Sequence, residues 1–231
     1  MSRIILKLSG EALAGSKGTG FDEETVRGVA LQVKTLVDKG TQVGVVIGGG
    51  NFWRGRTGTE IDRVKSDQIG MLATVMNCIY VSEIFRSNGM KTEILTPFAV
   101  GAFTKLYSKD LAMESLAEGK VVFFAGGTGH PYFSTDTATV LRAVEIEAEM
   151  ILLAKSVDGV YDDDPKSNPN ARKFSEISIA EVVAKGLGVV DGAAAVIAKE
   201  NKMPMLVFGL NEKDSIIRAA GGDIDGTVVT V

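Results

Sequence analysis

Three glycine-rich segments are the part of the sequence most able to do chemistry. They read "KLSG" at residues 7–10, "GGGN" at 48–51 and "GGTGH" at 126–130. Backbone N–H groups in such turns form concave anion sites, and glycine lets a ligand approach the backbone closely. Lys7 and Arg54 lie in or beside two of these segments and would add positive charge. The combination predicts a site for a polyphosphate ligand.

The remaining reactive side chains favour phosphoryl transfer over other chemistry. Neither G-x-x-x-x-G-K-[ST] nor G-x-G-x-x-G occurs at the "GGGN" segment, and there is no Cys/His cluster for zinc and no G-x-S-x-G. His130 is the one histidine, and Cys78 lies among apolar residues, which is typical of a core cysteine. Phosphoryl transfer needs mainly cations, N–H donors and magnesium, all compatible with this inventory.

Composition excludes several classes of protein. The 231 residues are 45% hydrophobic and 23% charged, which is typical of a globular protein with a substantial core. The net charge of −4 argues against a nucleic-acid partner, which would need a basic face. The single cysteine excludes an intrachain disulfide and fits a reducing cytoplasm. No apolar run approaches a membrane span or a signal sequence, so we expect no membrane association.

Apolar segments that indicate strands alternate along the chain with segments of helical period. Strands are expected at 3–8, 43–47, 92–95, 120–125, 149–155, 203–210 and 226–231, and helices at 21–40, 66–89, 108–119, 134–148, 178–186 and 191–202. Continuously apolar strands that alternate with helices indicate an α/β fold with a parallel sheet covered on both faces. Ligands bind such sheets at the carboxyl ends of the strands, where the glycine-rich segments fall.

Six segments together resemble the bacterial uridylate kinases, a family of the amino acid kinase superfamily. They are "KLSGEAL", "VGVVIGGGNFWRG", "SDQIGMLATVMN", "GGTGHPYFSTDTA", "VDGVYDDDP" and "VVDGAA", and they occur in the family's order between residue 3 and about residue 208. The resemblance implies a three-layer α/β/α sandwich with a mostly parallel sheet. It also implies one domain, 1–231, with an acceptor-binding part at about 1–150 and an ATP-binding part at about 151–231.

The resemblance further implies a reaction and a cellular setting. The reaction is the magnesium-dependent conversion of ATP and UMP to ADP and UDP, in the pyrimidine (CTP) branch of nucleotide synthesis. The enzyme would be a cytoplasmic homohexamer with GTP and UTP as candidate effectors. Magnesium would arrive with ATP, and no direct ligation of the metal by side chains is predicted.

Residue roles follow by matching positions to the family's motifs. The matched catalytic residues are Lys7, Arg54, Asp136 and Asp191. The matched ATP-binding residues are Lys7, Leu8, Ser9, Gly10, Gly50, Arg54, Lys155, Tyr161 and Asp164. The matched UMP-binding residues are Gly49, Asp67, Thr128, Gly129, His130, Pro131, Tyr132, Phe133, Ser134 and Thr135. The candidate allosteric residues are Lys17, Gly18, Thr19, Gly20, Phe21 and Asp22.

Several of these residues also have a plain structural interpretation. Lys7 and Arg54 could be solvated cations, and Asp67 and Asp136 could be acids favoured near a helix start. Asp191 precedes a predicted helix and could be only its N-cap. The neighbours of Asp164 in the "DDD" run are interpreted as solvated turn carboxylates.

Two alternative functions remain open from the sequence. Superfamily kinases that act on carboxylates or carbamate share the glycine turns, but Asp67 and the "TGHPYFSTD" segment favour a nucleotide acceptor. A storage or sensor protein would bind anions without turnover, but Lys7, Arg54, Asp136 and Asp191 are all present. The predicted helix 66–89 carries more apolar surface than one core contact needs, so we expect it at a subunit interface.

Overall fold

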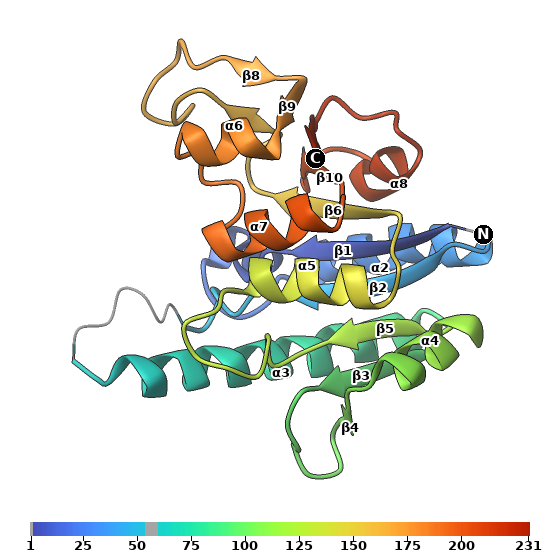
Figure 1. The fold of residues 1–231 in the computed structure, drawn as a ribbon. Coiled ribbons are helices and arrows are strands. Elements are labelled where there is room, and N and C mark those ends of the chain that lie inside the picture. Colours follow the sequence, from blue (N-terminus) through green and yellow to red (C-terminus); the bar gives the residue numbers. More distant parts are fainter. Residues whose placement is uncertain (1, 54–59) are drawn as a thin grey trace.

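The apolar segments form one central sheet. A computed structural model describes residues 2–53 and 60–231, and within them nine strands are ordered β4-β3-β5-β2-β1-β6-β10-β11-β9 (Figure 1). The strands are β1 (Arg3–Leu8), β2 (Gln42–Ile47), β3 (Thr92–Thr96), β4 (Lys105–Leu106), β5 (Val121–Phe124), β6 (Met150–Lys155), β9 (Glu176–Ser178), β10 (Met205–Gly209) and β11 (Thr227–Thr230). Every neighbouring pair is parallel except β10 and β11. The prediction of a mostly parallel sheet is confirmed.

Helices cover both faces of this sheet. They are α1 (Gly10–Ala14), α2 (Glu23–Asp38), α3 (Arg63–Ser87), α4 (Lys109–Ala117), α5 (Thr135–Glu145), α6 (Ile179–Ala184), α7 (Gly192–Glu200) and α8 (Ser215–Ala220), with a short 3₁₀ turn at Gly15–Lys17. One hydrophobic core joins α2, α3 and α8 to the sheet, and a second core joins α4, α5, α6 and α7 to the opposite face. These are the three layers of an α/β/α sandwich.

The strand sequences explain why two cores form. Along β1, Ile4 and Leu6 belong to the first core and Ile5 to the second, because successive side chains of a strand point to opposite faces. Strands buried on both faces must be apolar at every position, which produces the continuous apolar runs seen in the sequence. Lys7 interrupts the apolar run of β1 next to the carboxyl end of the strand.

Side-chain caps fix where the main helices begin. Asp22 accepts a hydrogen bond from the Thr25 N–H at the start of α2, and Ser108 accepts one from Leu111 N–H at the start of α4. Helix α3 begins three residues before the predicted start, because Asp62 provides its cap. The first turn of α3 is polar and shows no apolar periodicity, so the sequence pattern predicts the start of the helix too far along the chain.

Helix α3 is the longest helix in the described residues, and it is exposed along one side. Its most apolar 18-residue window has a mean hydropathy of 1.3, and by length and composition alone it could cross a membrane. In this fold α3 packs against β2, β3, β5 and α2, and 44% of that window is buried. Leu72, Met76 and Ile79 nevertheless remain exposed on its outer side.

Several short elements were not predicted. They are α1, α8, β4, β9 and a separate antiparallel pair, β7 (Val160–Tyr161) with β8 (Lys173–Phe174). The missed strands have two or three residues each and the missed helices have five or six, so their periodic signal is weak.

Candidate active site

The loops after the central strands meet at one edge of the sheet, because β5, β2, β1 and β6 are parallel neighbours. The loops after β1 and β2 touch directly: the Gly48 N–H donates to the Leu8 carbonyl at 3.0 Å. A β-carbon on Gly10 would lie 2.4 Å from the Gly48 carbonyl oxygen. The predicted phosphate-binding turns therefore form one surface where parallel sheets usually bind ligands.

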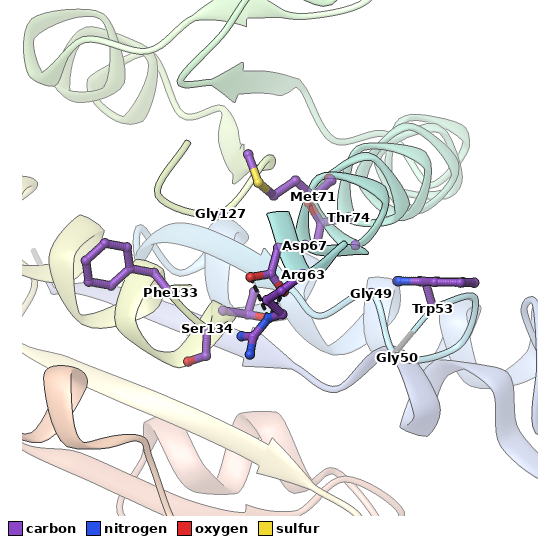
Figure 2. Close-up of a pocket in the computed structure, with 12 residues that line it drawn as sticks. Gly49, Gly50, Trp53, Arg63, Asp67, Met71, Thr74, Gly127, Phe133 and Ser134 are labelled. Carbon is purple, nitrogen blue, oxygen red and sulfur yellow. Dashed lines mark hydrogen bonds and ion pairs between the residues drawn. The ribbon is translucent and has the colours of Figure 1, made fainter. Parts of the chain in front are cut away.

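A cavity of about 180 Å³ opens between the turn after β2, the start of α3 and the loop before α5; we call it the α3 pocket (Figure 2). Its lining residues are Gly49, Gly50, Trp53, Arg63, Asp67, Gly70, Met71, Thr74, Gly127, Phe133, Ser134 and Thr135. A β-carbon on Gly49 would lie 2.9 Å from the Gly70 carbonyl oxygen, so the turn fits against α3 only without a side chain. The pocket thus combines backbone N–H groups with one carboxylate and one guanidinium.

Asp67 is the polar centre of the α3 pocket. Arg63 Nε lies 2.9 Å from both carboxylate oxygens of Asp67, one helical turn away on α3 (Figure 2). The Tyr132 N–H donates to Asp67 Oδ2 at 2.7 Å, and Tyr132 has a φ of 71°, which is uncommon for a residue other than glycine. Asp67 therefore joins the start of α3 to the 126–134 loop and keeps part of its carboxylate turned to the pocket.

The 126–134 loop brings only part of the predicted acceptor segment to the α3 pocket. Phe133, Ser134 and Thr135 line it. Thr128, Gly129, His130, Pro131 and Tyr132 do not; the Thr128 hydroxyl and the His130 backbone bond each other in a local turn, and His130 is exposed. The loop is anchored at its base, where the Gly126 N–H donates to Thr74 Oγ1 at 2.8 Å. These five residues are not part of the pocket lining.

Lys7 and Asp136 form an ion pair at the sheet edge. Lys7 Nζ lies 2.8 Å from Asp136 Oδ1, and the two side chains are 11% and 20% exposed. Asp136 Oδ1 is buried, and among the described residues it accepts no well-directed hydrogen bond besides this contact. A cation at the end of β1 and an oxygen with spare acceptor capacity at the start of α5 are thus held together beside the glycine turns.

Asp191 fixes the start of α7 against the start of α5. It accepts hydrogen bonds from the Ala194 N–H at 3.0 Å, from Thr137 Oγ1 at 2.8 Å and from Ser134 Oγ. Burial raises the pKa of Asp191, but the hydrogen bonds from Ser134, Ala194 and Thr137 outweigh it, so the pKa lies below its ordinary value. The N-cap interpretation of Asp191 is correct, and the carboxylate also joins two helix N-termini.

A second cavity, of about 440 Å³, lies beyond β6; we call it the β6 pocket. Its lining residues are Lys155, Val157, Gly159, Val160, Tyr161, Asp162, Asp163, Asp164, Pro165, Lys185, Gly186, Leu187, Gly188, Val189 and Val207. It has apolar walls from valines and a leucine with carboxylates at one side, which suits a flat ring carrying polar substituents. All three predicted residues of this region, Lys155, Tyr161 and Asp164, are part of its lining.

Lys155 links the β6 pocket to the Lys7–Asp136 pair. Its ammonium group donates to the Val189 carbonyl, and its strand, β6, pairs with β1, the strand that carries Lys7. Burial lowers the pKa of Lys155, while the charge of Asp136 acts in the opposite direction. The Lys7–Asp136 pair lies between the two pockets in the strand order, because β1 runs between β2, whose following turn lines the α3 pocket, and β6, whose Lys155 lines the β6 pocket.

The carboxylates of the 158–164 loop mostly hold the loop itself. Asp162 Oδ1 accepts from the Arg172 N–H at 2.7 Å, and Asp163 Oδ2 accepts from the Asn168 side chain at 2.9 Å. Tyr161 donates its hydroxyl hydrogen to Asp158 Oδ1 at 2.7 Å. Turn carboxylates commonly make such local bonds.

The remaining predicted residues lie around the glycine turns. Leu8 is buried at the end of β1, Ser9 is the N-cap residue of α1, and Gly10 and Gly50 belong to the two touching turns. The candidate allosteric residues, Lys17 to Asp22, form the loop before α2, where Lys17 Nζ donates to the Phe21 carbonyl at 3.1 Å. The predicted catalytic residue Arg54 lies outside the described residues.

Sequence reasoning missed several residues that build this region. Arg63 could have been found from its spacing of four residues to Asp67, a common helical ion-pair spacing. Thr137 and the 185–189 segment carried no comparable signal, because their partners are 54 and 34 residues away in the chain. Thr74 lies in a quoted motif but looks like an ordinary helix residue until the loop that it anchors is seen.

Comparison with known proteins agrees with the fold. The model of the amino acid kinase family matches residues 2–209. The crystal structure of UMP kinase from Bacillus anthracis is similar with a TM-score of 0.94 and 35% identity, over 99% of this chain and 96% of that chain. The crystal structure of UMP kinase from Ureaplasma parvum is similar with a TM-score of 0.94 and 32% identity, over 100% of this chain and 99% of that chain.

These similarities extend over nearly the whole chain and include every element that builds the two pockets. The predicted resemblance and the predicted sandwich are therefore confirmed, and the protein belongs to the amino acid kinase family.

Proposed function

We propose that this protein is a UMP kinase that transfers the γ-phosphoryl group of ATP to UMP, with magnesium. The two solved UMP kinases that it resembles match it from end to end. The observation that carries the proposal is the position of the Lys7–Asp136 pair: Lys7 is on β1, which runs between β2, whose following turn lines the α3 pocket, and β6, whose Lys155 lines the β6 pocket. A two-substrate transfer needs such an arrangement, because donor and acceptor must face each other across the cation that stabilises the moving group.

The β6 pocket would hold the nucleoside of ATP. Its volume of about 440 Å³ and its apolar walls fit a purine ring, while Lys155, Tyr161 and Asp164 supply polar groups. The triphosphate would then run along Leu8, Ser9 and Gly10 toward Gly50 and the predicted Arg54. The part of the chain from about 151 to 231 would thus bind the donor.

The α3 pocket would hold UMP. Gly49 and the turn after β2 would contact its phosphate, and Asp67 would accept hydrogen bonds from its ribose. The predicted base contacts come from the 126–134 loop, with Phe133, Ser134 and Thr135 already at the pocket wall. For Thr128, Gly129, His130, Pro131 and Tyr132 to contact UMP, the loop would have to close over the ligand. The part of the chain from about 1 to 150 would thus bind the acceptor.

Lys7 would stabilise the transferring group electrostatically. Its ammonium group is nearly buried and is paired with Asp136. Charge on the phosphoryl oxygens spreads as the bond to ADP breaks, and a preorganised cation stabilises that charge without reorganising. A UMP phosphate is already an anion at neutral pH, so the acceptor needs no general base.

Magnesium would enter with ATP and neutralise its phosphates. Asp136 fits a role beside it, since Oδ1 is buried and has spare acceptor capacity for a water of the metal's shell. In residues 2–53 and 60–231 there is no group of three or more His, Cys, Asp or Glu side chains that could hold a metal ion. Direct ligation by a side chain is not part of the proposal.

The cellular setting that we propose is the cytoplasm, in pyrimidine nucleotide synthesis, with neither nucleic acid nor membrane as partner. The exposed apolar side of α3, with Leu72, Met76 and Ile79, supports assembly with further copies of the chain, and we propose a hexamer. GTP and UTP are the proposed effectors, with the loop from Lys17 to Asp22 as the candidate site.

A coupled ADP-release assay tests the proposal. The purified protein is given ATP and magnesium with UMP, then with carbamate, then with small carboxylates, and then with no acceptor. We expect rapid ADP release and UDP formation with UMP alone. Turnover on an acid instead of UMP would make the protein a different kinase of the family, and saturable binding of anions without ADP release would make it a binding protein.

A further inference from the structure

A pair of buried asparagines lies directly beneath the glycine turn and belongs to neither pocket lining. Asn77 is in the middle of α3 and is 0% exposed, and Asn51 follows the glycine triplet and is 2% exposed. Buried amides are uncommon in protein interiors unless their hydrogen bonds are made, because an unpaired polar group is costly to bury. Asparagine is also a weak helix former, so the interior of α3 gains nothing from it locally.

The two side chains form a closed amide pair. Asn77 Nδ2 donates to Asn51 Oδ1 at 2.8 Å, and Asn51 Nδ2 donates to Asn77 Oδ1 at 3.0 Å. The second hydrogen of each amide is also used: Asn77 donates to the Gly48 carbonyl at 2.7 Å, and Asn51 donates to the Gly20 carbonyl at 2.9 Å. All four amide hydrogens are therefore satisfied, and the four bonds connect α3, the turn and the loop before α2.

These bonds determine where the glycine turn lies. Gly48 is held from one side by the Leu8 carbonyl and from the other by Asn77. Gly10 packs against the two oxygens to which Asn77 donates. A β-carbon on Gly10 would lie 2.4 Å from the Gly48 carbonyl oxygen and 2.5 Å from Asn51 Oδ1. The turn that would hold the acceptor phosphate is thus fixed between α1 and α3 with no space to shift.

The same pair reaches the loop before α2. Gly20 donates its N–H to the Asn51 carbonyl at 3.3 Å and accepts from the Asn51 side chain. Phe21 stacks on Tyr80 of α3, with ring centroids 3.9 Å apart, and meets Phe52 edge-on. Asn51 therefore connects that loop directly to the phosphate turn.

We propose that Asn51 and Asn77 are positioning residues of the transfer site: their amide pair sets the place of the 48–51 turn and ties it to the loop at 17–22. The inference rests on the proposed function for the identity of the bound phosphate. A displacement of about 1 Å in a group that positions substrate can lower turnover about 100-fold. The pair acts through the turn and does not itself touch substrate.

Asn77→Leu is the informative variant, because leucine has a similar size but neither amide group. Cys78→Ala is the matched control: Cys78 is the next residue of α3, it is also fully buried, and its loss loosens the same helix without touching the amide pair. Asn51→Ala is the second variant, which removes the pair from the loop side if Asn77→Leu does not fold. Thermal melts of all variants give their stabilities.

Hydrogen–deuterium exchange is measured first, on the protein without ligands. We expect faster exchange in Asn77→Leu for the segments 48–53 and 17–22 together, with Cys78→Ala close to wild type in both. With UMP as acceptor, we expect kcat/KM for UMP in Asn77→Leu to fall about 10- to 100-fold and KM for ATP to change far less.

Unchanged exchange at 48–53, or equal changes in Cys78→Ala, would show that the pair only packs the helix and would overturn the inference. Normal kcat/KM for UMP despite faster exchange would do the same. If wild type does not phosphorylate UMP, the proposed function fails on its own, and the exchange data still decide whether the pair holds the turn.

Discussion

Gly10→Ala is expected to destabilise the protein, although alanine is the better helix residue. Gly10 is the first residue of α1, and in an isolated helix the change to alanine would stabilise by up to about 1 kcal/mol. In this fold the new β-carbon would lie 2.4 Å from the Gly48 carbonyl oxygen and 2.5 Å from Asn51 Oδ1. Both atoms are held by Asn77, so neither can move without breaking a hydrogen bond.

The magnitude follows from setting these two effects against each other. Forcing one extra methyl group into a filled site costs about 1–3 kcal/mol, and here the upper part of that range applies because the obstacle is backbone. After the helix gain is subtracted, we expect a loss of about 1–2 kcal/mol in the free energy of unfolding. For a chain of 231 residues this corresponds to a fall in Tm of about 2–8 °C.

Gly28→Ala is the matched control. Gly28 lies inside α2, and no atom would come within 4 Å of its new β-carbon. We therefore expect the opposite sign, a gain of about 0.5–1 kcal/mol, seen as a higher Tm in differential scanning calorimetry. A Gly10→Ala protein that melts at or above the wild-type temperature would refute the close packing of the two glycine turns.

Three further outcomes are expected. Lys7→Ala should lower kcat by about 100-fold or more, with KM for ATP changed much less, because the charge acts mainly in the transition state; turnover within about threefold of wild type would remove that role. Asp191→Asn should lower the free energy of unfolding at pH 7, as measured in urea titrations. The difference from wild type should vanish as pH falls below about 4, because a carboxylate with a lowered folded-state pKa stabilises the fold only while it is ionised. A difference in stability that persists at pH 2 would contradict this. Replacing Leu72 and Met76 with glutamate should dissociate the assembly in light scattering, and a wild-type protein that is already monomeric at micromolar concentration would exclude an interface on α3.

The layers of the fold could be predicted because their signals are long and repeated. Most of the seven predicted strand segments were continuously apolar, and burial on both faces of the sheet explains that composition. The short elements could not be predicted: α8 has six residues and follows Asp214, whose φ of 52° is not encoded by any obvious turn residue pair. Local sequence is weak evidence for an element that is too short for its apolar periodicity to be recognised.

Within the candidate site, residue types could be predicted but their partners could not. Lys7 and Asp136 could each be proposed from a motif, yet their 2.8 Å contact depends on how α5 packs over β1. The bonds from Ser134 and Thr137 to Asp191 cross between two helices more than 50 residues apart in the chain. Such contacts arise from tertiary packing and leave no periodic trace in the sequence.

The most direct test of the central claim is a panel of nucleoside monophosphates. Specificity constants for UMP, CMP, AMP and GMP are measured at fixed ATP and magnesium by coupled ADP release. The phosphate turn cannot distinguish these acceptors, so discrimination must come from the α3 pocket and the 126–134 loop. A pocket that hydrogen-bonds one base edge can reject other bases by about 10⁴-fold. We predict a preference for UMP of that order, and comparable constants for UMP and CMP would contradict the account.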